Sequence, residues 1–304
     1  MTEFQQPLSL GYHTDLAVRF HEGGSCEVLE LADLGPVVRV ATPSNPTFWW
    51  GNFLLMPRPP RVGELPAWLA AFRQAHPQAR HVTFGLDTTD GEGGAQQEFV
   101  DAGFSLHRDT VLTTSQTVPP RTLNTDLNFR PLDATQDADW QAALGLRMAV
   151  NAADPEPHEA AGYQTFAARK LDAARAAQHR GRGAVFGAFG PTGQMYSGLG
   201  VFSADGAHRA GGVTRYQNVE THPETRSLGL AGTLVHRAGE WARTHLNAQT
   251  LVIVADPAYH AQRLYERAGF RPTEIQTAWE RPPQEERSAT ESGSNPDSGR
   301  QAEP

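Results

Sequence analysis

A short segment in the second half of the chain carries the residues best suited to hold a phosphate. Residues 226–231 spell R-x-x-G-x-A at the expected start of a helix. The first amides of a helix have no intrahelical partner and point outward, with the positive end of the helix dipole behind them. A glycine lets an anion approach the backbone, and an arginine adds a fixed positive charge. We expect this anion-binding turn to be lined by Arg226, Ser227, Leu228, Gly229, Leu230, Ala231 and Gly232.

The turn lies between elements that would hold it in place. Residues 212–221 predict a strand, and Pro223 marks the end of it. After the turn, apolar residues recur at helical spacing. These are Leu230, Ala231, Leu234, Val235, Ala238, Trp241, Ala242 and Leu246. Residues 250–255 predict a buried strand, after which Asp256 and Pro257 supply an N-cap and a first-turn proline for a short helix.

The turn resembles the pyrophosphate-binding loop of the GNAT superfamily of acyl-CoA-dependent N-acyltransferases, whose pattern is Q/R-x-x-G-x-G/A. The family also ends with A-x-x-L-Y-x-x-x-G-F, matched here by Ala261, Leu264, Tyr265, Gly269 and Phe270. Order, spacing and residue types agree over 129–281, roughly half the chain. The resemblance implies an α/β (α+β) GNAT fold, in which helices flank a mixed central β-sheet, and acetyl-CoA as the co-substrate.

The resemblance also implies the residues nearest the thioester. Tyr265 occupies the family's tyrosine position, where a phenol can donate a proton to the leaving thiolate; the alternative is an aromatic residue that only packs. Ala261, on the same helix, is expected to contact the cofactor. The backbone of Val219 and Thr221 should bind the pantetheine arm and the thioester oxygen.

Direct transfer to an amine needs a base to remove a proton. Glu220, late in the central strand, is the candidate, and burial there would raise its pKa toward a useful range. Strand alternation predicts that Asn218 shares its face. His222 is a second choice as the base, and the alternative for Glu220 is a structural hydrogen-bonding role.

An acidic loop follows the first predicted helix of this half. Residues 136–150 and 163–180 predict helices, and Asp154 and Glu156 lie between them. In GNAT-like folds this region covers the acceptor site. The two carboxylates could therefore recognise a cationic amine, although a solvated turn is an equally good interpretation.

The first part of the chain repeats this order in a weaker form. Phe99–Phe104 ends in Ala-Gly-Phe, as Leu264–Phe270 does, and a threonine-containing strand follows each. The predicted elements before and after are strands at 47–56, 81–86 and 108–114 and helices at 64–75 and 92–102. We therefore expect two GNAT-like domains in tandem.

The turn at 57–63 in the first half contains three prolines and no R-x-x-G-x-G/A pattern. Proline has no N–H to offer a phosphate. Phe99 or Val100 stands near the position of Tyr265. The half could be a second acyl-CoA site, or a structural half that shapes the substrate cleft or replaces a dimer partner. We favour the structural interpretation.

The predicted organisation has four parts. A degenerate GNAT-like domain covers 1–118 and a proline-containing linker covers 119–128. The acetyltransferase domain covers 129–282, and a polar tail at 283–304 is expected to be disordered.

Composition narrows the partners. The net charge of −8 argues against nucleic acid, and no run of 18 apolar residues suggests a membrane span. Cys26 is the single cysteine, which excludes an intrachain disulfide and fits a cytoplasmic protein; a nucleophilic role for it is less favoured than that of a small loop residue. The histidines lack metal-ligand spacing, so we expect no metal.

These observations predict an N-acetyltransferase that moves the acetyl group of acetyl-CoA directly to a primary amine. The acceptor would be a small molecule or a peptide, and the protein a monomer or homodimer. A non-catalytic acyl-CoA-binding or regulatory module, and transfer of a longer acyl group, remain as alternatives.

Overall fold

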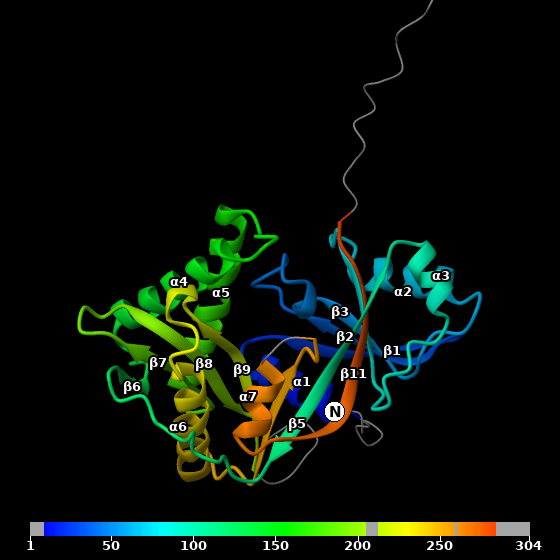
Figure 1. Ribbon diagram of the computed structural model, residues 1–304. Helices are drawn as coiled ribbons and strands as arrows, with labels where there is room; N and C mark the ends of the chain where they lie inside the picture. Colours follow the sequence, from blue (N-terminus) through cyan, green and yellow to red (C-terminus); the bar gives the residue numbers. More distant parts are fainter. Residues whose placement is uncertain (1–8, 205–211, 259–260, 284–304) are drawn as a thin grey trace, which may run out of the picture.

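One continuous sheet runs through the whole protein. The computed structural model describes residues 9–204, 212–258 and 261–283, so all but the first residue of the predicted disordered tail lies outside the described residues. The 11 strands of this part follow the order β1-β2-β3-β4-β11-β5-β10-β9-β8-β7-β6 (Figure 1). The mixed sheet flanked by helices confirms the predicted fold class.

The elements alternate as expected for two α/β units in sequence. The first half contains α1 (Leu10–His21), β1 (Ser25–Leu31), β2 (Gly35–Ala41), β3 (Phe53–Met56), α2 (Leu65–Ala75), β4 (Val82–Leu86), α3 (Gln96–Asp101) and β5 (Ser105–Thr114). The second contains β6 (Asn128–Pro131), α4 (Asp137–Ala152), α5 (Ala160–His179), β7 (Gly183–Phe189), β8 (Met195–Ser203), β9 (Val213–Thr221), α6 (Leu230–His245), β10 (Thr250–Ala255), α7 (Ala261–Arg267) and β11 (Arg271–Arg281).

The two halves exchange their last strands. β5 from the first half lies between β10 and β11 of the second, and β11 lies between β4 and β5. Ala278, for example, pairs with Gly85 on one side and with His107 on the other. Figure 1 shows β5 and β11 running side by side through the centre of the molecule. The parts of the chain before and after the predicted linker at 119–128 therefore share one sheet. Each half completes its part of that sheet with a strand from the other half.

The helices form two layers on this sheet. α6 and α7 pack on one face through a cluster that includes Leu234 and Tyr265, and α2 and α3 continue that layer over the first half through Trp68 and Phe99. α4 and α5 cover the opposite face of the second half. α1 lies on that same face at the junction, because it contacts Val111 of β5 and Val252 of β10.

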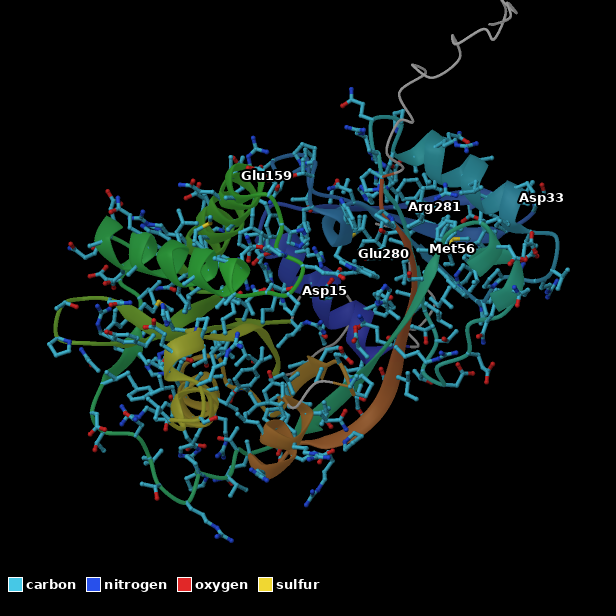
Figure 2. All side chains as sticks on the ribbon, turned by 45° about the horizontal axis from the view of Figure 1, so that its top comes forward. Asp15, Asp33, Met56, Glu159, Glu280 and Arg281 are labelled. Carbon is cyan, nitrogen blue, oxygen red and sulfur yellow. The ribbon has the colours of Figure 1, made fainter. Side chains whose placement is uncertain are left out.

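α1 also brings a buried charge cluster to the junction. Asp15 forms ion pairs with Arg19 on the same helix and with Arg215 on β9 (Nε to Oδ1, 3.9 Å). Burial opposes ionisation of Asp15, but the charges of Arg19 and Arg215 outweigh it and hold the pKa of that carboxyl below its usual range. Figure 2 shows Asp15 on α1, near the middle of the molecule. The cluster ties the first half to the central strand of the second.

The sequence predicted most of these elements and missed three. Strands β9 and β10 and helices α4, α5 and α6 lie within a few residues of their predicted bounds. The strand predicted at 47–56 was too long, since a 3-10 turn occupies Trp49–Gly51 and β3 begins at Phe53. α1, β1 and β2 were not predicted. No helix in the described ranges has both the length and the apolar character needed to cross a membrane.

Candidate active site

The central strand of the second half separates from its parallel neighbour. β9 pairs with β10 only where Val213–Arg215 lie opposite Thr250–Val252. Toward its end, β9 contains a bulge against β8, with Asn218 in a left-handed conformation at a φ of 51°. A bulge bends its strand and increases the local twist. The last residues of β9 therefore diverge from β10.

A cavity of about 360 Å³ opens where the strands diverge. It is lined by Val150, Val219, Glu220, Thr221, Thr225, Arg226, Ser227, Gly229, Leu230, Ala231, Gly232, Ala261, Leu264 and Tyr265. The structure thus brings together every residue predicted to contact the cofactor, apart from Leu228. The side chain of Leu228 is 58% exposed and lies outside this lining.

The turn before α6 has the geometry of an anion site. Ser227 and Gly229 both adopt left-handed conformations, with φ angles of 66° and 75°. Gly229 is the N-cap of α6, and its carbonyl accepts the amide of Thr233 at 3.1 Å. Among the described residues, the amides of Leu230, Ala231 and Gly232 have no hydrogen-bond partner. These three donors face the same cavity as the exposed Arg226.

Tyr265 reaches this cavity from α7. Its side chain is largely buried, with 5% exposed, and its ring packs edge-on against Phe270 with the centroids 6.4 Å apart. Val219 and Glu220 line the cavity from the other side. The helix itself begins at Ala261, after a turn in which Asp256 Oδ1 accepts the amide of Ala258; residues 259–260, within the predicted start of the helix, lie outside the described residues.

Glu220 lies on β9 beside α4, and its side chain is partly buried, with 21% exposed. Burial raises the pKa of its carboxyl, while the charge of Arg147 acts in the opposite direction. Arg147 Nε lies 3.8 Å from Glu220 Oε2. His222 is in the turn beyond, where its backbone amide donates to Tyr196 O at 2.8 Å. A carboxyl with a raised pKa beside the cavity suits general-base chemistry.

Strand alternation does not place Asn218 on the face of Glu220, so that prediction was wrong. The bulge interrupts the alternation: Glu220 pairs with Gly198, and Gln217 pairs with Gly200. Residues directly opposite each other on paired strands point to the same side, so Gln217 takes the expected position. Asn218 nevertheless borders a second, smaller cavity together with Glu220 and Arg147.

The acidic loop lies apart from both cavities. Asp154 and Glu156 are solvent-exposed, and Asp154 Oδ1 accepts the amide of Glu156 at 3.0 Å. Neither borders the cavity at β9 or the smaller one. On α5, burial and the charges of Glu220 and Asp154 raise the pKa of the Tyr163 phenol, while the charge of Arg147 opposes them.

Sequence reasoning missed Arg147, although a signal for it exists. Arg147 follows Trp140 and Ala143 at helical spacing, on the face of α4 that packs into the core. A charged side chain in an apolar stripe indicates a buried ion pair or a ligand contact. Within the described ranges, no group of three His, Cys, Asp or Glu side chains is placed to hold a metal ion.

Comparisons with known proteins agree with this geometry. Residues 150–270 match the Acetyltransferase (GNAT) family. No curated protein matches the chain. A conserved protein of unknown function from Staphylococcus epidermidis has a similar structure at 11% identity, with a TM-score of 0.62 over 81% of this chain and 90% of that one.

Two further solved structures cover most of the chain. One is a GCN5-related N-acetyltransferase from Kribbella flavida, with 14% identity and a TM-score of 0.55 over 90% of this chain and 96% of that one. The other is a tandem GNAT protein from the clavulanic acid biosynthesis pathway, with 14% identity and a TM-score of 0.52 over 87% of this chain and 86% of that one. The predicted resemblance to the GNAT superfamily is confirmed.

Proposed function

Because residues 150–270 match the GNAT acetyltransferase family and most of the chain has the fold of a tandem GNAT protein, we propose that it transfers an acetyl group from acetyl-CoA to a primary amine. One observation carries this proposal. A single cavity combines the open amides before α6 with Tyr265 on one wall and Glu220 on the other. The site thus has a phosphate-binding end and a reactive end.

The turn before α6 would hold the pyrophosphate. Its amides point into the cavity with the helix dipole behind them, and Arg226 adds a positive charge. The diverging end of β9 would bind the pantetheine arm through the backbone of Val219 and Thr221. This arrangement directs the thioester toward Glu220 and Tyr265.

The chemistry would then need a base for the amine and an acid for the leaving thiolate. The carboxylate of Glu220 takes a proton from the acceptor ammonium, which leaves a neutral amine. The amine nitrogen forms a bond to the acetyl carbon, the carbon–sulfur bond breaks, and the thiolate takes a proton from the hydroxyl of Tyr265. The second proton lost by the nitrogen passes to solvent. Glu220 then releases its proton to solvent, and solvent restores the proton of Tyr265. The products are an N-acetyl amine and CoA.

The structure favours this proposal over its two alternatives. A longer acyl group would need space beside Val219, toward Leu199 and Val201 on β8. These two residues are 1% and 0% exposed and belong to the core beneath α6. Val219 borders the cavity and they do not, which supports acetyl transfer. A module that only binds acyl-CoA would not need a carboxyl with a raised pKa at the reactive end.

The direct test is CoA release in the presence of amines. The full chain is mixed with acetyl-CoA and a panel of amino acids, polyamines, aminosugars and peptides, and the free thiol is measured. We expect acceptor-dependent release with at least one amine. If no amine raises thiol release above hydrolysis while CoA still binds, the protein is a binding module.

The pH profile tests Glu220 as the base. A base acts when it is ionised, so kcat/KM should rise with pH through the pKa of Glu220, which burial has raised. Glu220→Gln removes the titrating group and should abolish this rise while CoA binding is kept. The measurement needs an acceptor whose own amine pKa lies well outside the range. An unchanged profile in Glu220→Gln would assign the base to water or to another residue.

A further inference from the structure

Arg147 is a largely buried cation that has no hydrogen-bond partner among the described residues. The residue is 9% exposed, and its guanidinium carries five N–H donors. In the described part of the chain it forms one ion pair, in which its Nε lies 3.8 Å from Glu220 Oε2, farther than a hydrogen bond allows. Within the described residues no carbonyl, hydroxyl or carboxylate accepts from Arg147. An enclosed guanidinium with unused donors is costly unless water or a ligand satisfies them.

The guanidinium borders a cavity of about 20 Å³ between α4, α5 and β8. Asn218 and Glu220 border the same space, and Glu220 also borders the larger cavity. A volume of this size holds a water molecule or one small polar group of a ligand. A group placed there would therefore be separated from the reactive end of the larger cavity by the side chain of Glu220.

Arg147 supplies the positive charge available to a ligand in this space. Glu22, the other acidic residue at the cavity besides Glu220, accepts a hydrogen bond from Lys170 at 2.8 Å. Both side chains of that pair are buried, so Lys170 and Glu22 neutralise each other. The planar fork of an arginine matches a carboxylate through two parallel hydrogen bonds. The free donors of Arg147 thus suit an anionic group.

We propose that the acceptor is an amine with a carboxylate beside it, an α-amino acid or a close analogue, and that Arg147 binds this carboxylate. The proposal rests on the proposed acetyltransferase function. Arg147 and Glu220 present opposite charges side by side, and an α-amino acid carries its ammonium and carboxylate on a single carbon. With the carboxylate on Arg147, the ammonium lies at Glu220, which removes its proton. Asp154 and Glu156, the candidates for binding a cation, lie outside this space.

The test compares each common L-amino acid with its own carboxamide, which keeps the shape and removes the negative charge. Rates are measured as CoA release at saturating acetyl-CoA and are expressed per concentration of free amine, because the carboxamide also changes the amine pKa. We expect at least one amino acid to exceed its carboxamide by about 10-fold or more in kcat/KM, the range of a charged hydrogen bond. Arg147→Gln should bring this ratio close to one.

Two further variants make the result specific. Arg147→Lys keeps the charge and loses the fork, so it should retain part of the preference and serves where Arg147→Gln does not fold. Arg243→Gln removes an exposed arginine on α6 and should leave the ratio unchanged. Circular dichroism and calorimetry with CoA check that each variant is folded.

The outcomes separate this inference from the function on which it rests. An equal loss in Arg147→Gln for both members of a pair would mean that Arg147 acts only through Glu220, and would overturn the proposal. Release with amines that lack a carboxylate, but with no amino acid, would overturn it while the acetyltransferase function stands. No release with any amine would instead overturn the acetyltransferase function.

Discussion

The last helix of each half, α3 and α7, ends in the same kind of turn. This turn shows which residues of the two halves correspond. The amide of Phe104 donates to Phe99 O at 3.0 Å, and the amide of Phe270 donates to Tyr265 O at 3.1 Å. The glycine between them has a positive φ in both halves, at Gly103 and Gly269. Phe99 is therefore the counterpart of Tyr265, while Val100 points outward and is 52% exposed. The chemistry differs at a position where the fold does not.

The strands beneath this helix differ more. In the second half, β9 leaves β10 after Arg215. In the first half, β3 stays paired with β4 up to Met56 and Leu86, and the amide of Asp87 then donates to Met56 O at 2.8 Å. Strands that remain paired to their ends offer no backbone groups and no space to a pantetheine arm.

The helix N-termini complete the contrast. The amides of Gly63 and Leu65 at the start of α2 donate to the carboxylate of Glu98, at 2.7 and 3.3 Å. Pro66 has no amide to donate. At α6 the corresponding donors have no partner in the described chain. The first half thus satisfies its own anion site with an internal carboxylate, and the second leaves it open. If the second half binds acetyl-CoA as proposed, these local groups distinguish it from the first half, since the two halves share the fold.

Removing one of the exchanged strands should have the largest effect. A chain of residues 122–304 lacks β5, which separates β10 from β11, so we expect it to aggregate instead of folding. Light scattering and circular dichroism would show this. The control is a full chain with a protease site introduced at 121–123, which should stay folded after cleavage because both pieces remain in the sheet. A soluble, monomeric 122–304 chain that binds CoA would contradict the structural role of the first half.

Tyr265 tests whether its position is for packing or for chemistry. Phe99 fills the equivalent site without a hydroxyl and is fully buried, so packing there requires only the ring. Tyr265→Phe should therefore change thermal stability little and reduce kcat by about 10²–10⁴-fold, the usual contribution of a general acid. CoA affinity should be unchanged. Turnover close to wild type would make Tyr265 a packing residue like Phe99.

A pair of glycines tests the two turns directly. Gly63 and Gly229 both have positive φ, and a Cβ atom on either would meet no atom within 4 Å. An aspartate at either position therefore causes similar backbone strain. Gly229→Asp should weaken CoA binding by about 100-fold, because a carboxylate would then lie among the phosphates. Gly63→Asp should leave it unchanged. Calorimetry of both variants decides the assignment, and equal affinities would move the phosphate site elsewhere.

The sequence predicted what local patterns determine. The R-x-x-G-x-A turn and the A-x-x-L-Y helix placed the cavity lining correctly because strand, turn and helix signals lie within a few residues of each other. The exchange of β5 and β11 could not be predicted, since either strand pairs equally well by composition within its own half. The bulge in β9 occurs at Asn218, where the sequence has no glycine or proline to signal it. The pattern therefore predicts regular alternation of side chains along the whole strand.

The sequence also does not predict which residues far apart in the chain contact each other. Glu98 and Gly63 are 35 residues apart in the sequence, and no local rule joins them. Arg147 meets Glu220 only through the packing of α4 on β9. The prolines of the first turn did indicate that it lacks amides for a phosphate. The carboxylate of Glu98 reaches the amides of Gly63 and Leu65 only because α3 packs beside the start of α2.

Glu98 gives the smallest effect and the sharpest form of the comparison. Glu98→Gln keeps the shape and removes the charge that two amides at the start of α2 share. Hydrogen bonds to charged groups contribute about 1.5–3 kcal/mol, and glutamine can still accept one of them, so unfolding in denaturant should show a loss of about 1–2 kcal/mol. Glu92→Gln, an exposed change on the loop before α3, should alter stability by less than about 0.5 kcal/mol. CoA stoichiometry should stay at one per chain in Glu98→Gln, because β3 and β4 remain paired even when the carboxylate is gone. A second CoA bound by this variant would mean that Glu98 alone closes the first half, and that its paired strands can open.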